Sequence, residues 1–321
     1  MSGAWRTAQR RAMDHVIALV AASPVGESLL LRGSITMAAW VGGQAREPGD
    51  LDWVVRPRDG VPLDRDFPYP YLDRLDHART WAEAAHGAIR QELWEFEDFD
   101  TKGVRVRLPP EGTRWVAFLD SDASQPHADV LDLVRHQPQD PHGLWFDTEG
   151  ATEAGGWGYA YADDYYYDDA GAGGGGARLL LPWRFEELSG TLQLDFSYCE
   201  ALPDAPVRIE IPRADGGPPT ALWTAGPELS LAWKLRWLEH DSHRGAKGKD
   251  LYDAVLLAEL DGMRLPRPVH DQLRRRSGLD ALRPDAVRSW QIDWPDHLPG
   301  TAEHWLARLA AALPRVLDPM P

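Results

Sequence analysis

The stretch that most constrains this chain is residues 32–55, RGSITMAAWVGGQAREPGDLDWVV. A Gly-Ser pair, Gly33 and Ser34, opens an apolar helix-like run, and a strand then begins with Asp50 and Asp52. Because strand side chains alternate between faces, the two carboxylates leave the same face, about 7 Å apart. They repel each other unless cations stand between them, and Mg²⁺ is the hard ion that suits oxygen ligands. An acidic strand end facing water is the alternative interpretation.

The Gly-Ser pair lies where a helix is expected to begin, after a strand over 29–33 and before a strand over 51–57. At such a position the backbone N–H groups and the hydroxyl of Ser34 can together bind a phosphate group. Serine is also a common N-terminal cap, so capping alone is the alternative.

The composition limits the classes of protein and partner. With 321 residues, 43% of them hydrophobic, the chain can form one large domain or two modest ones around a core that holds a polar site. The single cysteine, Cys199, excludes an internal disulfide framework and fits a reducing compartment. No segment has the pattern of a signal peptide or the roughly 18 apolar residues of a membrane span. We therefore expect a cytoplasmic protein with no membrane partner.

The net charge of −16 argues against an extended nucleic-acid surface, which normally carries a basic footprint. Compact anionic ligands remain compatible with it, because bound metal ions supply positive charge locally. Short basic clusters occur, for example Arg274 to Arg276, but the favoured interpretation of each is an ordinary solvated surface patch.

Hydrophobic spacing and Pro/Gly punctuation predict a mixed α/β chain without internal repeats. Helices are expected over 4–22, 35–42, 72–93, 227–240, 249–260 and 300–316, the last with Thr301 as N-cap. Strands are expected over 29–33, 51–57, 104–108, 114–120, 178–183, 191–198 and 207–213. The Tyr/Asp/Gly-rich stretch 159–177 is expected to be a mobile acidic loop.

Four further charged residues stand out in the second half. The apolar residues of 191–198 share one strand face, so Asp195 leaves the other. Lys234 falls within the apolar stripe of 227–240, where it either extends along the buried face or meets a triphosphate at the edge of a site. Asp250 and Asp253 lie at i, i+3 on the first turn of the next helix, where carboxylates commonly interact with the helix dipole.

In this order, the motifs resemble those of the nucleotidyltransferase superfamily with the polymerase-beta-like fold. The branch they resemble is AbiEii/MenT, known chiefly as toxins of type IV toxin–antitoxin pairs. The resemblance covers roughly residues 5–58 and 178–260. It rests on Gly33-Ser34, the R-x-x-x-D-x-D of Arg46 to Asp52, QLDFS around Asp195, AWKL around Lys234 and KDLYD at 249–253.

The resemblance implies a role for each matched residue. Asp50, Asp52 and Asp195 would bind two magnesium ions, and Asp195 could take the proton of an acceptor hydroxyl. Gly33, Ser34 and Lys234 would contact the phosphates of a nucleoside triphosphate. Asp250 and Asp253 would line the site from the adjoining helix, Asp253 on the phosphate side.

The expected architecture is a nucleotidyltransferase fold with a mixed β-sheet core. The core would comprise 1–59 and 178–225, with a long insertion at 60–177 as a lid or acceptor-selecting subdomain, and a helical region at 226–321 lining the cleft. The expected activity is magnesium-dependent transfer of a nucleoside monophosphate to a hydroxyl.

The acceptor and the partners stay open at this stage. A toxin would modify RNA, specifically transfer RNA, and would have an antitoxin partner, although the net charge argues against an RNA groove. A small-molecule or protein acceptor is the alternative. A further alternative is a non-catalytic nucleotide-binding or interaction module, with tryptophans such as Trp223 and Trp290 serving a partner.

Overall fold

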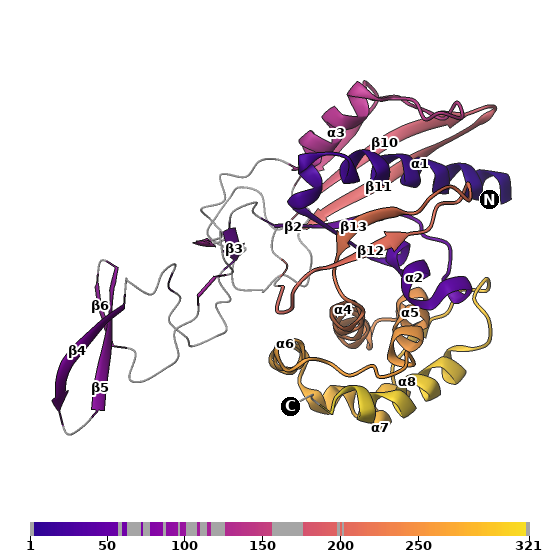
Figure 1. Cartoon of the computed structure of the whole chain (residues 1–321). Helices are drawn as coiled ribbons and strands as arrows, with labels where there is room; N and C mark the ends of the chain where they lie inside the picture. Colours follow the sequence, from indigo (N-terminus) through magenta and orange to yellow (C-terminus); the bar gives the residue numbers. More distant parts are fainter. Residues whose placement is uncertain are drawn as a thin grey trace. The chain divides into compact units, whose positions relative to one another are not determined.

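The structure is a computed structural model of the whole chain (Figure 1). It describes residues 3–56, 60–62, 72, 78–85, 88–95, 97–100, 108–109, 114–116, 126–155, 176–197, 200 and 202–318. Contacts divide the chain into two compact units, Met1–Val55 with Pro126–Pro321, and Arg56–Gln125.

The large unit is built on one mixed eight-stranded sheet, in the order β12-β13-β1-β2-β11-β10-β8, with β9 also paired to β10. The pairs β1–β13 and β2–β11 are parallel, and the other pairs are antiparallel. The strands are β1 (Leu29–Arg32), β2 (Leu51–Val55), β8 (Trp145–Phe146), β9 (Thr152–Gly155), β10 (Gly176–Phe185), β11 (Leu188–Ser197), β12 (Val207–Ile211) and β13 (Thr220–Thr224).

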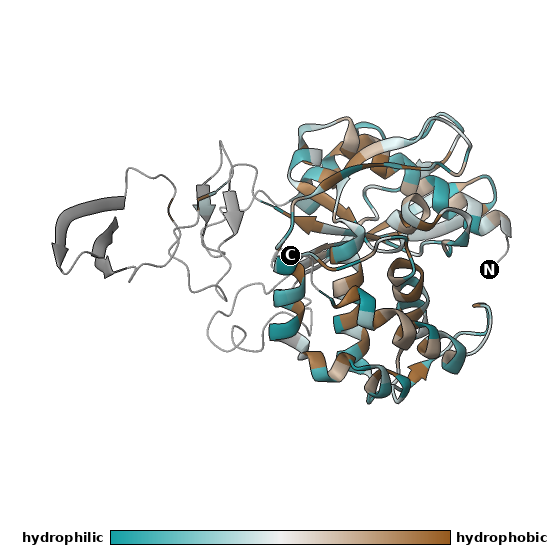
Figure 2. Cartoon of the chain, turned by 60° about the horizontal axis from the view of Figure 1, so that its bottom comes forward, coloured by the Kyte–Doolittle hydropathy of each residue, from teal (hydrophilic) through white to brown (hydrophobic). Residues whose placement is uncertain are grey.

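Helices cover both faces of this sheet, because alternate strand residues enter two different cores. Leu29 and Leu31 pack with α1 (Gly3–Ala21) and α3 (Pro126–His136). Leu30 and Val54 pack on the opposite face, with α4 (Pro227–Asp241), α5 (Gly248–Ala258) and α8 (Ala302–Val316). Figure 1 shows these two helical groups on either side of the strands, and Figure 2 shows the hydrophobic segments on the strands and helices.

The alternation fixes the direction of the polar strand residues. Leu51 and Trp53 belong to the core under α1, so Asp52 leaves the face that α4 and α5 cover. Asp195 lies likewise between Leu194 and Phe196 of the α1 core. Both carboxylates therefore point to the helical side of the sheet, as the alternation predicts.

Shorter elements complete the large unit. They are α2 (Ser34–Val41), the 3₁₀ turns η1 (Pro24–Glu27), η2 (Gly42–Gln44) and η5 (Leu279–Leu282), α6 (Arg267–Ser277), α7 (Pro284–Arg288), and the parallel pair β14 (Ala246–Lys247) and β15 (Ile292–Asp293). Thr301 caps α8 by accepting a hydrogen bond from the His304 N–H, which confirms the predicted N-cap. None of the helices in the described part is long and apolar enough to cross a membrane.

The second unit contains two small sheets. β3 (Gly60–Pro62) pairs with β7 (Arg114–Val116), and β4 (Ala78–Ala85), β5 (Ala88–Glu95) and β6 (Glu97–Asp100) form an antiparallel sheet. The helix predicted over 72–93 is therefore wrong: β4 and β5 pair antiparallel, with Ala85 opposite Ala88. The alanine-rich composition had favoured a helix, and strand pairing overrides that propensity.

Most other predicted elements are confirmed within the residues the structure describes. The strand expected over 104–108 falls largely outside them, and so does the loop expected over 159–177, whose last two residues begin β10. The elements that were not predicted include α3, β13 and α6. α3, β8 and β9 lie within the range expected to be an insertion, yet they belong to the large unit, and residues 56–125 alone form the separate one.

Candidate functional site

A row of four charged residues crosses the centre of the sheet. Arg32 on β1 is opposite Asp52 on β2, Asp52 is opposite Asp195 on β11, and Asp195 is opposite Arg178 on β10. Directly opposed residues share a face, so this register places two carboxylates side by side between two guanidinium groups. We call Arg32, Asp52, Asp195 and Arg178 the cross-strand row.

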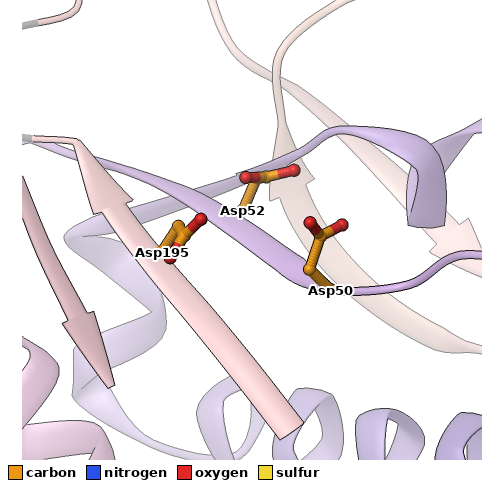
Figure 3. A group of neighbouring side chains, drawn as sticks. All are labelled: Asp50, Asp52 and Asp195. Atoms are coloured by element: carbon orange, nitrogen blue, oxygen red, sulfur yellow. The ribbon is translucent and has the colours of Figure 1, made fainter. Parts of the chain in front are cut away.

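Asp50 joins the two carboxylates from just before β2. Carboxylate oxygens of Asp50, Asp52 and Asp195 all lie within 4.8 Å of one another (Figure 3). Asp195 is buried, with 5% of its surface exposed, whereas Asp50 and Asp52 are partly exposed. Three carboxylate oxygens at this separation form a ligand set for a hard divalent cation.

The electrostatics of the three carboxylates are unfavourable without a cation. The pKa of Asp52 is raised to about 7, first by burial and then by the charges of Asp50 and Asp195, while the charges of Arg32 and Lys249 oppose the shift. Arg32 is itself buried and pairs with Glu200 at 2.8 Å. Because Arg32 also pairs with Glu200, the two arginines of the cross-strand row only partly neutralise the three carboxylates.

Asp195 is held in place by two neighbours. Arg178 donates from Nε and Nη2 to the two carboxylate oxygens at 2.7 and 2.9 Å, and the amide of Gln193 donates at 2.9 Å. A carboxylate offers about four lone-pair positions, so these bonds leave room for a further ligand. Arg178 and Gln193 thus orient Asp195 toward Asp52.

The Gly-Ser pair lies against Asp52. Gly33 has a φ of 80°, and a Cβ built on it would overlap Oδ2 of Asp52, so only glycine fits here. Ser34 is the first residue of α2 and only 4% exposed, yet its hydroxyl has no hydrogen-bond partner. Ser34 does not cap the helix, so its buried hydroxyl lacks a protein partner at a residue that borders the site, which leaves a donor for a ligand to satisfy.

A buried cluster on α4 and α5 faces the carboxylates. Lys234 Nζ donates to Asp253 at 2.9 Å and to Asp250 at 3.2 Å. Asp253 is fully buried and also pairs with Arg46 at 3.0 Å. Burial alone lowers the pKa of Lys234, but the charges of Asp253 and Asp250 outweigh it and raise the pKa above its usual value, so the ammonium is retained.

Asp250 has the complementary shift. Burial raises its pKa, but the charge of Lys234, followed by those of Lys249 and Arg46, outweighs burial and lowers the pKa. Asp250 is therefore an anion beside a permanent cation. Lys234, Asp250 and Asp253 were each singled out in the sequence without being paired, and the structure joins them by direct hydrogen bonds.

These groups line one cavity of about 210 Å³. Its charged lining is balanced, with five residues of each sign: Arg46, Arg178, Lys234, Lys247 and Lys249, and Asp50, Asp52, Asp195, Asp241 and Asp250. Lysine occurs only at positions 102, 234, 247 and 249, although lysine and arginine together number 34. Three of the four lysines thus line this cavity, in a chain of net charge −16.

The structure brings together seven of the eight residues singled out in the sequence: Gly33, Ser34, Asp50, Asp52, Asp195, Lys234 and Asp250 all line the cavity. Asp253 lies behind Lys234 and is not part of the lining. Sequence reasoning missed Arg32, Arg178, Gln193 and Lys249 as members of the site. Only the alternation of 191–198, which places Gln193 on the face of Asp195, carried a signal for any of them.

The second half of the chain matches a family model described as nucleotidyl transferase AbiEii toxin, type IV TA system, over residues 150–318, which is more than half of its length. The match contains Asp195, Lys234 and Asp250 but ends short of the Gly-Ser pair and of Asp50 and Asp52. The pairing of β2 with β11 joins the two parts of the site, because it places Asp195, inside the matched range, opposite Asp52, outside it. No curated protein matches the sequence.

Among solved structures, the fold is similar to that of MenT4, a nucleotidyltransferase toxin from Mycobacterium tuberculosis H37Rv. The TM-score is 0.53 at 14% identity, covering 99% of this chain and 86% of MenT4. Two Helicobacter pylori structures, one described as a nucleotidyltransferase and the other as JHP933, give TM-scores of 0.49 and 0.47. Their identities are 14% and 13%, and the alignments cover 99% of this chain and 96% and 94% of theirs. The MenT4 likeness confirms the predicted fold.

Proposed function

Because the chain belongs to the AbiEii family of nucleotidyltransferase toxins from type IV toxin–antitoxin systems, we propose that it transfers a nucleoside monophosphate from a nucleoside triphosphate to an RNA hydroxyl. The expected acceptor is transfer RNA, and the expected partner is an antitoxin protein. The observation that carries the proposal is the convergence of three carboxylates, a Gly-Ser turn and a buried lysine on one cavity.

The donor set fits magnesium. Asp50, Asp52 and Asp195 offer hard oxygen ligands within 4.8 Å of one another, and the pKa of Asp52 is raised by burial and by the charges of Asp50 and Asp195, which a cation would offset. We expect these residues to hold two magnesium ions. When bound, magnesium supplies positive charge that stabilises the attacking and leaving oxygens of phosphoryl transfer.

The phosphates of the nucleotide would lie between α2 and α4. Ser34 offers its unpartnered hydroxyl, and the start of α2 offers backbone N–H groups beside Gly33. Lys234 faces the same cavity with a permanent charge, so it would neutralise the triphosphate. Asp253, which lies behind the ammonium, acts in this proposal as the residue that positions Lys234 rather than as a phosphate contact.

At the acceptor, Asp195 takes the proton of the attacking hydroxyl. That oxygen then forms a bond to the α-phosphorus, and the bond to pyrophosphate breaks. Arg178 and Gln193 fix the Asp195 carboxylate through three hydrogen bonds, so its orientation is set before substrate arrives. The protein's contribution is therefore mainly position and charge.

The proposal is tested by incubating the protein with each radiolabelled nucleoside triphosphate and total bacterial RNA, with Mg²⁺ or with EDTA. We expect Mg²⁺-dependent label in the transfer RNA fraction, and none with Asp52→Ala. Asp285→Asn serves as control, because Asp285 is 99% exposed on α7. Transfer by Asp52→Ala at the wild-type rate would overturn the metal assignment, and label only in protein or small molecules would overturn the RNA acceptor.

The toxin role has its own test. Expression of the wild type without an antitoxin should stop bacterial growth, and expression of Asp52→Ala at the same level should not. Normal growth with soluble, active wild type would contradict the toxin assignment and leave the transferase assignment intact.

A further inference from the structure

One face of α4 runs along the cavity beyond Lys234. Lys234, Trp237, Leu238 and Asp241 all line the cavity, and their spacing of i, i+3, i+4 and i+7 is that of a single helix face. Seven residues of α-helix span about 10 Å, which is comparable to the reach of a nucleotide from its outer phosphates to its base. Along this face, α4 therefore carries the ammonium group of Lys234, then the apolar residues Trp237 and Leu238, then the carboxylate of Asp241.

Trp237 and Leu238 are the apolar members of the cavity lining in the described part of the chain. The Trp237 indole is partly exposed and fixed from within, since the Arg32 guanidinium carbon lies 5.6 Å from the ring centroid and 5.0 Å from that of Trp233. An indole held in this way presents a rigid flat surface with little conformational entropy left to lose. Such a surface suits stacking of a planar base.

We propose that this face of α4 is the nucleobase subsite, with Trp237 stacking on the base and Asp241 contacting its edge. The proposal rests on the proposed function and deepens it by naming what selects the nucleotide. With Lys234 at the phosphates, the base falls one to two helical turns further along α4. Arg32 of the cross-strand row connects this subsite to the carboxylates, because it contacts the Trp237 indole and also lies opposite Asp52 in the sheet.

Asp241 determines which nucleobases this subsite is expected to prefer. A carboxylate accepts hydrogen bonds, so it favours a base edge with an exocyclic amino group, as in adenine, guanine and cytosine. Uracil presents carbonyl oxygens at the corresponding positions, which a carboxylate repels. The subsite should therefore select against UTP, because the carbonyl oxygens of uracil and the Asp241 carboxylate are all hydrogen-bond acceptors and repel one another.

The test measures binding of each radiolabelled nucleoside triphosphate by equilibrium dialysis with Mg²⁺, together with the KM and kcat of transfer. Trp237→Ala should weaken nucleotide binding and raise KM on the order of tenfold, with kcat nearly unchanged. Trp237→Phe keeps a stacking ring and should restore affinity to within about threefold. Trp145→Ala is the matched control, because Trp145 is 38% exposed and does not line the cavity.

Inorganic tripolyphosphate separates a base contact from general damage to the cavity. It lacks a base, so its affinity as a competitor should be the same in the wild type and in Trp237→Ala. Asp241→Asn should narrow the preference for amino-bearing bases over UTP by about tenfold, because an amide donates as well as accepts.

The outcomes distinguish the two levels of the proposal. If Trp237→Ala changes nucleotide affinity no more than Trp145→Ala, or changes tripolyphosphate affinity equally, the base subsite is wrong while the transferase proposal stands. Binding without transfer would overturn the proposed function, and the variant affinities would still decide the subsite. A wild type that binds no nucleoside triphosphate would overturn both.

Discussion

Replacing Asp52 by asparagine should stabilise the protein in the absence of metal, and more so at high pH. The pKa of Asp52 is raised by burial from 3.8 to about 7, so between these values the folded state holds a proton that the unfolded state has released. Stability therefore falls as pH rises through this range and is constant above it. Asparagine has the shape of the protonated acid and does not titrate.

The expected size follows from that shift. Each pKa unit corresponds to about 1.4 kcal/mol, so the full shift costs the wild type at most about 4 kcal/mol above pH 7. About 2 kcal/mol of this develops between pH 5.5 and pH 7. For a unit of about 250 residues, that equals a change of about 4 °C in Tm.

The assay is thermal unfolding of metal-free wild type and Asp52→Asn at pH 5.5 and pH 8. The variant should gain about 4 °C relative to the wild type between the two pH values. Saturating Mg²⁺ at pH 8 should raise the Tm of the wild type and close this gap, with little effect on the variant. Asp285→Asn should follow the wild type throughout. A Tm difference between Asp52→Asn and wild type that is equal at both pH values would refute the reasoning.

Three other substitutions follow from the same cavity. Ser34→Ala should change the free energy of unfolding by less than about 1 kcal/mol in urea unfolding, because no hydrogen bond is lost. It should nevertheless weaken the binding of tripolyphosphate in a competition assay, and unchanged binding would contradict the role of Ser34 at the phosphates. Gly33→Ala should displace Asp52 and destabilise the fold by about 1–3 kcal/mol in urea unfolding, and the stabilisation by Mg²⁺ should be lost. Normal stabilisation by Mg²⁺ would contradict the displacement of Asp52. Asp253→Asn should cost about 3–5 kcal/mol in urea unfolding, because it leaves Lys234 and Arg46 underpaired in the interior; a loss below about 1 kcal/mol would contradict the buried pairing.

The sequence was enough to predict the direction of each site side chain, but not which residues lie next to it. Period-two alternation was enough to send Asp52 and Asp195 away from their apolar flanks, and helical spacing was enough to place Lys234 on a buried face. The partners Arg32 and Arg178 could not be found in this way. Their proximity depends on strand register, which joins residues far apart in the chain and has no local signature.

The errors in the fold have a related cause. β4 and β5 contain alanine, arginine and glutamate, which are good helix formers, and pairing within the β4-β5-β6 sheet makes them strands. α3 was not expected, because the whole range 60–177 had been assigned to an insertion. Its buried residues Val130, Leu131 and Val134 instead join the core of the large unit.

The parallel pairing of β2 with β11 also sets the moment at which a newly made chain can become active. Asp52 leaves the ribosome 143 residues before Asp195 (195 − 52), an interval of about 10–30 s at ordinary rates of synthesis. Lys234, on α4, arrives later still. On the proposed function, a nascent or prematurely terminated chain would therefore be inactive, and an antitoxin would need to bind only molecules that have been translated past α5.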